Sequence, residues 1–160
     1  MPYVVVAIAV VTVVLAGLLF IVPPVRESRR RAQQAKLQKD FRLQRERLEA
    51  LFVEQVMKSG KPRGLRWREP DFHNPVVFAR DRKTSHLMAF VGLTVSFEAI
   101  EGGGMEDVPA VDNLRAATAL FRHDGQHWQT DGRVLFNLEP AEAVAYYERE
   151  LETLIDVPNP

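Results

Sequence analysis

A run of twenty apolar residues at positions 3–22, YVVVAIAVVTVVLAGLLFIV, constrains this chain more than any other feature. An α-helix rises about 1.5 Å per residue, so the run is long enough to cross the roughly 30 Å hydrocarbon core of a bilayer. It contains no Asp, Glu, Lys or Arg, and Pro23 and Pro24 follow it directly. Because proline has no N–H to donate, we expect the helix to end there. The sequence therefore predicts a membrane anchor at residues 1–24.

Two other interpretations of the run fit the sequence less well than the anchor does. A cleaved signal peptide would have a basic start, a shorter apolar core and a small-residue cleavage site. Here Met1, Pro2 and Tyr3 bring no positive side chain, and no A-x-A pattern precedes the prolines. A buried core helix would more often have only about 10 to 14 apolar residues. The retained signal-anchor is the preferred interpretation.

Positive residues follow the run, and none precedes it. The nearest are Arg26, Arg29, Arg30 and Arg31. Because positive residues stay on the cytoplasmic side, we expect a single-pass topology with the C-terminal domain in the cytoplasm. The four arginines would then contact anionic lipid headgroups of the inner leaflet. The absence of cysteine is in keeping with a reducing compartment.

The rest of the chain divides by charge. Residues 23–63 hold twelve Lys and Arg against five Asp and Glu, whereas residues 64–160 hold nine against sixteen. This predicts a basic helical stalk at 25–60 and an acidic domain at 61–160, large enough for one modest core. The acidic domain would repel phosphates, so no nucleic acid partner is expected.

Residues 27–58 read as one long helix, because they lack Pro and Gly until Ser59-Gly60-Lys61-Pro62. An apolar stripe marks its second half: Leu48, Leu51, Phe52 and Val56. We expect this stripe to pack on the sheet of the distal domain. A coiled-coil seam with a partner is the alternative, but three of its seven core positions would be glutamine.

The distal sequence alternates with the period of β-strands. Five strands are expected at 65–67, 76–80, 87–100, 114–121 and 127–138, with a loop at 69–75, a turn at 81–85 and a hairpin at Asp124-Gly125. Asp131-Gly132 predicts a bulge or second turn inside the last strand. Pro140 begins a C-terminal helix whose apolar face would be Val144, Tyr147, Leu151, Leu154 and Ile155. The fold class is therefore α+β, an antiparallel sheet covered on one face by the stalk end and the C-terminal helix.

One segment carries a resemblance to a known superfamily. Residues 114–138, LRAATALFRHDGQHWQTDGRVLFNL, have an Asp-Gly tip and a Trp on the returning strand. They resemble the terminal hairpin of the cone-shaped, nuclear transport factor two-like superfamily. The resemblance implies a cone-shaped domain. Members of that superfamily include enzymes, ligand binders and scaffolds, and membrane-tethered members occur in secretion-system assembly and mitochondrial import.

Polar clusters give few candidates for chemistry. Asp71 and His73 with Glu69 could form an acid–base group, and Asp71, His73 and His86 are the candidates for a polar pocket. His123 and His127 flank a hairpin tip where two strands could share a metal, but no third ligand is evident. The acidic glycine-rich segment at 101–107 matches neither a P-loop nor an EF-hand. We predict no catalytic residue, metal or cofactor.

The combined expectation is a non-enzymatic membrane protein that presents a small domain to another protein, as an adaptor or accessory subunit. One alternative is a ligand binder or acid–base enzyme with a cone-shaped pocket. The other is a structural subunit whose span packs on other spans through small residues: Ala7, Ala9, Ala16 and Gly17.

Overall fold

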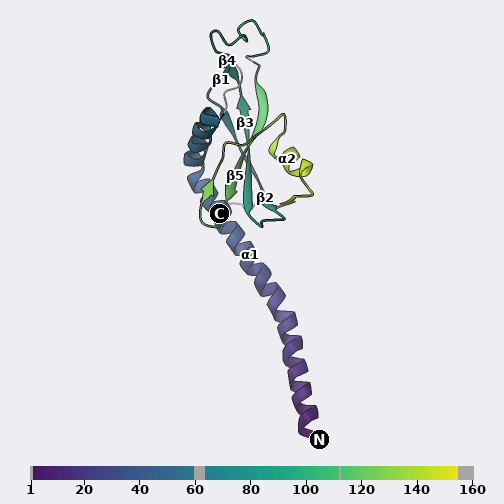
Figure 1. Ribbon diagram of the computed structural model, residues 1–160. Helices are drawn as coiled ribbons and strands as arrows, with labels where there is room; N and C mark the ends of the chain where they lie inside the picture. The colour runs from purple at the N-terminus through teal and green to yellow at the C-terminus, as the bar shows by residue number, and fades with distance from the viewer. Residues whose placement is uncertain (1, 60–63, 112, 155–160) are drawn as a thin grey trace. The chain divides into compact units, whose positions relative to one another are not determined.

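The structure, a computed structural model, describes residues 2–59, 64–111 and 113–154, and gives only the backbone of residues 2, 4–26 and 59 (Figure 1). The chain divides into two compact units, Met1–Lys39 and Asp40–Pro160. The first unit is helical, and in it Arg31 and Glu27 form the expected i,i+4 ion pair at 2.6 Å. The second unit holds the end of that helix and all the strands that the structure describes.

Helix α1 spans Pro2–Ser59, so the long helix expected at 27–58 is confirmed. Its predicted end at Pro24 is wrong, because the helical backbone continues through both prolines. Proline removes one hydrogen bond but already has a helical φ, and the helix formers that follow continue the helix. No helix in the part of the chain searched, whose side chains are described, is long and apolar enough to cross a membrane. The apolar run on which the predicted anchor depends lies outside those residues.

Among the described residues, eight strands form two antiparallel sheets, where five strands were expected. The strands are β1 (Leu65–Trp67), β2 (Asp71–Asp81), β3 (Leu87–Val95), β4 (Phe97–Ala99), β5 (Arg115–His123), β6 (Trp128–Gln129), β7 (Val134–Phe136) and β8 (Leu151–Thr153). The main sheet has the order β6-β5-β3-β2-β8, with β7 also paired to β5. β1 and β4 form a separate two-stranded sheet. The expected antiparallel α+β fold is confirmed at this level.

Two predicted strands are divided. The strand expected at 87–100 breaks at Ser96, where the chain leaves β3 and pairs with β1 instead. The strand expected at 127–138 becomes β6 and β7, with Asp131-Gly132 in the interruption, as its bulge signal indicated. Both halves still pair with β5.

The loop predicted at 69–75 is wrong from Asp71 onward, because these residues begin β2. Phe72 pairs with Leu93 and Val76 with Val91, so His73, Asn74 and Pro75 lie opposite Gly92 alone. This is a β-bulge, and a bulge accepts proline because its residues leave the hydrogen-bond ladder. The proline that suggested a loop marks an irregularity within a strand.

One face of the main sheet is covered by α1 from Phe41 onward. Phe41 makes edge contacts with Phe78 and Phe121 at centroid distances of 5.7 and 5.4 Å, and with Trp128 at 4.9 Å. Phe52 lies 5.8 Å from Phe121. Since Leu48 and Val56 are buried as well, the prediction that the stripe packs on the sheet is confirmed.

The other face carries a second core beneath helix α2 (Pro140–Tyr146). This core joins Ala79, Phe90, Leu120, Ala143, Val144 and Leu151. Phe78 and Ala79 are consecutive in β2, so they point to opposite faces. The expectation that both helices cover one face is therefore wrong, and Figure 1 shows the end of α1 and α2 on opposite sides of the sheet.

The C-terminal helix is shorter than its apolar spacing predicted. A turn at Tyr147 ends it, with the N–H groups of Glu150 and Leu151 donating to the carbonyl of Tyr147. Leu151 then begins β8, which pairs with the end of β2 at Asp81. Strand pairing along the edge of β2 provides backbone hydrogen bonds that a longer helix would not give that edge.

Candidate functional site

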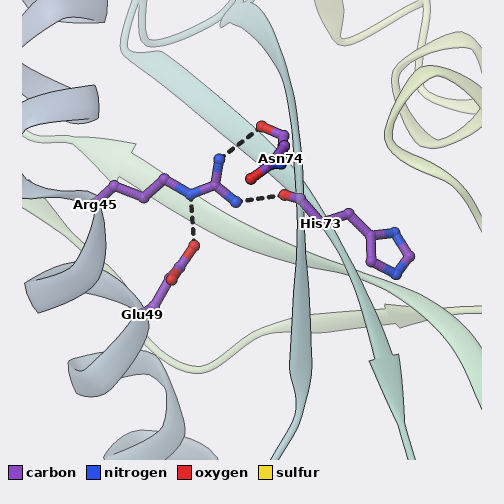
Figure 2. Close-up of polar contacts among 4 residues, drawn as sticks. All are labelled: Arg45, Glu49, His73 and Asn74. Atoms are coloured by element: carbon purple, nitrogen blue, oxygen red, sulfur yellow. Dashed lines mark hydrogen bonds and ion pairs between the residues drawn. The ribbon is translucent and has the colours of Figure 1, made fainter.

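Arg45 of α1 holds the backbone of the β2 bulge. Its guanidinium donates to the carbonyls of His73 and Asn74, the latter at 2.6 Å, and to Glu49 at 2.6 Å (Figure 2). Arg45 and Glu49 are both largely buried. Because carbonyl groups in a bulge have no ladder partner, a forked donor is well suited to them. Arg45 therefore fixes the backbone from which the His73 side chain extends.

The His73 ring lies over Gly92 on the α2 face of the sheet. Its Nε2 is 2.9 Å from the hydroxyl of Thr94. A Cβ built on Gly92 would lie 3.0 Å from His73 Nδ1 and 3.5 Å from Glu139 Oε2. Because Gly92 has no side chain, there is room for the His73 ring above it. The imidazole and the Glu139 carboxylate both approach the position that a Cβ of residue 92 would occupy. We call His73, Thr94 and Glu139 the polar corner.

The three predicted pocket residues do not form one group. Asp71 is exposed and pairs with Thr94, so it lies near the polar corner. His86 precedes β3 and is at the opposite end of that strand from Thr94. Its Nδ1 is buried and has no hydrogen-bond partner among the described residues. Of the acid–base candidates, Asp71 and His73 both lie at Thr94.

The hairpin histidines have mainly structural contacts. His123 is buried, and its Nδ1 accepts a hydrogen bond from the backbone N–H of Gly125 at 3.1 Å. Its ring packs edge-on against Trp128. Burial lowers the pKa of His123, although the Asp124 and Asp40 carboxylates oppose this. In the described parts of the chain, no group of three or more His, Cys, Asp or Glu could hold a metal ion.

The acidic glycine-rich loop has internal contacts. The Glu106 carboxylate accepts a hydrogen bond from the backbone N–H of Gly103 at 3.1 Å. Backbone hydrogen bonds, first that of its own N–H, lower the pKa of Glu106. A Cβ on Gly64 would lie 2.4 Å from the carbonyl oxygen of Gly103, so the backbones meet at a distance that requires glycine.

Charged groups near Trp67 pair with each other. Arg66 lies 3.2 Å and Arg68 3.9 Å from the Glu98 carboxylate. Trp67 itself packs on Phe97 and Phe136, with centroids at 5.1 and 5.9 Å. One carboxylate is therefore shared between two arginines, while the indole packs against two phenyl rings.

The predicted headgroup contacts belong to the first unit. Arg29, Arg30 and Arg31 are exposed, and the Arg26 side chain lies outside the described residues.

A hollow of about 150 Å³ lies beside β5, and sequence reasoning did not find it. Arg122 and Arg133 line it together with Met88 and Leu120. Arg133 directly follows the turn signal Asp131-Gly132, and Arg122 lies two residues before Asp124-Gly125. Their positions beside turn signals were the available clue.

The comparisons with known proteins identify no relative. No family model, no curated protein and no solved structure matches this chain.

Proposed function

We propose that this protein is a single-pass membrane-anchored adaptor that holds a small α+β domain at the cytoplasmic face of the membrane. The observation that carries the proposal is the uncharged apolar run at 3–22, with four arginines within the nine residues that follow it. An apolar segment of this length favours insertion, and the charge asymmetry favours a cytoplasmic C-terminus.

The folded unit supports binding to a protein more than chemistry on a metabolite. Arg45 and His73 make hydrogen bonds within the fold, to backbone carbonyls and to Thr94. The hollow near β5, at about 150 Å³, is smaller than the roughly 300 to 1,000 Å³ of typical small-molecule pockets. An adaptor needs a stable surface and no deep pocket.

Fractionation and cysteine labelling test the anchor and its orientation. The full chain should stay with membranes after alkaline carbonate washing, and a variant lacking residues 1–24 should not. Because the chain has no cysteine, Lys83→Cys in the exposed turn after β2 provides a single reporter thiol. An impermeant maleimide should label it only after the cells are opened. Labelling in intact cells, or release of the full chain by carbonate, would contradict the proposal.

A second candidate function is small-ligand binding in a cone-shaped domain, as the superfamily resemblance implies. The polar corner favours it, since an imidazole and a carboxylate approach one point above Gly92. His73→Ala should then abolish the cellular role while the domain stays folded, whereas an adaptor should tolerate the change. Asp107→Ala is the control, because Asp107 is an exposed acidic residue of the loop at 101–107.

A further inference from the structure

The hollow beside β5 is built on the α2 face of the sheet. Met88, Arg122 and Gln129 form a row across β3, β5 and β6, since Met88 pairs with Arg122 and Arg122 with Gln129. Leu120, two residues before Arg122, belongs to the core beneath α2. The volume of about 150 Å³ equals that of an apolar cavity known to hold benzene. One apolar side chain would fill it.

The connection between β6 and β7 forms the wall of the hollow, and it is fixed to β5. The Thr130 hydroxyl donates to the carbonyl of Leu120 at 2.9 Å, and the N–H of Leu120 donates to the carbonyl of Arg133 at 3.1 Å. Gly132 lies against α1, where a Cβ would be 3.0 Å from the Cβ of Gln55. The hollow is therefore formed before any ligand arrives, which lowers the entropy cost of binding.

Two guanidinium groups at this hollow form no ion pair with any described residue. Arg122 and Arg133 are exposed, and neither forms an ion pair with any residue that the structure describes. The Asp131 carboxylate also lines the hollow, but it accepts a hydrogen bond from the backbone N–H of Arg133 at 3.1 Å. Arginine recognises carboxylates through paired N–H donors.

We propose that this hollow binds an acidic segment of a partner protein, with an apolar side chain on Met88 and Leu120 and an adjacent carboxylate on Arg122 and Arg133. The inference rests on the proposed adaptor function and names the class of its partner. A polyanion such as nucleic acid or an anionic bilayer would meet the acidic surroundings of residues 64–160, which hold sixteen Asp and Glu against nine Lys and Arg. A single carboxylate next to an apolar side chain, unlike a polyanion, can bind through the short-range contacts of the hollow alone.

Peptide binding to the full chain in zwitterionic detergent tests the proposal. The probe is a fluorescent peptide with a Phe-Glu-Glu centre between Gly and Ser residues, and its control has a Phe-Gln-Gln centre. We expect the acidic peptide to bind and the amide peptide to bind at least about tenfold more weakly. Arg122→Gln and Arg133→Gln should each weaken binding of the acidic peptide about tenfold, the loss typical of a charged hydrogen bond.

The control variant is Arg115→Gln, which removes the same charge from an exposed position on the same strand. This variant should bind the acidic peptide with an affinity within about twofold of that of the unchanged protein. An equal loss with Arg115→Gln would show a general charge effect and overturn the proposal. So would no binding of the acidic peptide at millimolar concentration, or a preference for inorganic phosphate or anionic vesicles over the peptide. Because the measurement is made in detergent, its failure leaves the membrane anchor untouched, and failure of the anchor leaves peptide binding untouched.

Discussion

The two faces of the main sheet differ in what covers them. The α1 face is closed by a long helix with aromatic side chains, and Phe41 and Phe52 are both fully buried there. The α2 face has a core in which Phe90 and Leu120 lie under a helix of only seven residues. The uncovered parts of this second face hold the polar corner and the hollow beside β5.

This difference indicates a division of work between the faces. Aromatic side chains bury large apolar areas and gain further from edge contacts, so the α1 face supplies much of the stability. A short helix leaves room on the α2 face for polar groups that a core would exclude. The following experiments test that division, beginning with the largest expected effect.

Removing an aromatic ring from the α1 face should cost the most stability. We expect Phe52→Ala to lower the free energy of unfolding by about 3 to 5 kcal/mol, because it deletes a fully buried ring and leaves a cavity. Urea unfolding of the full chain in detergent, followed by tryptophan fluorescence, measures this. Leu43→Ala, at an exposed position of the same helix, should change it by less than about 0.5 kcal/mol. Equal losses of stability in the two variants would refute the conclusion that the buried rings of the α1 face supply much of the stability.

Trimming the core of the α2 face should cost less. Val144→Ala removes two buried methyl groups, so we expect a loss of about 2 kcal/mol. The same unfolding assay applies, with Tyr146→Ala as an exposed control on α2. A loss as large as that of Phe52→Ala would mean that the two faces contribute equally.

Removing the hydrogen bonds from Arg45 to the β2 bulge should have a moderate effect on stability. Arg45→Met keeps the apolar stem but removes the donors to His73 and Asn74, and we expect a loss of about 1.5 kcal/mol. The NMR signals of the His73 ring should also move, since its backbone is released. Glu46→Gln, an exposed change one residue away, should do neither. Unchanged NMR signals of the His73 ring would show that the Arg45 hydrogen bonds do not position this ring.

Acidification should weaken the fold through His123, by the smallest of these effects. Its pKa is lowered by burial, so the unfolded chain takes up a proton at a higher pH than the native protein does. Stability should therefore be complete above the ordinary pKa of 6.5 and fall as the pH drops below it. Melting temperatures from pH 8 to 5 measure this, and His123→Phe should flatten the curve. An unchanged slope in that variant would show that the effect does not come from His123.

Local patterns predicted most of the elements. The helix at 27–58, the strand at 65–67 and the turn at Asp81 follow from signals within a few residues, and the turn forms with Asp81 accepting from the N–H groups of Lys83 and Thr84. The division of the helices between two faces depends on contacts far apart in the chain. A clue was present in β3, where Ala89–Leu93 contains no polar residue and is buried throughout. A continuous apolar strand indicates that both faces are covered.

The site was predictable only in part. His73 stood out by its residue type, but Gly92 and Glu139 reach it from segments 19 and 66 residues away. The break at Ser96 and the pairing of β8 with β2 were hidden for the same reason, because each is decided by a partner strand. Arg122 and Arg133 became notable only when the fold brought them to one hollow.

In the β2 bulge, His73, Asn74 and Pro75 lie opposite the single residue Gly92 of β3. At this point β2 therefore has two more residues than β3. Because side chains alternate, an even surplus leaves Phe72 on the same side as Val76, with its ring 5.8 Å from that of Phe52. Deleting one residue would turn Phe72 toward the opposite side of the sheet, while deleting two would return it. Insertions or deletions that this segment tolerates during evolution should therefore add or remove two residues at a time.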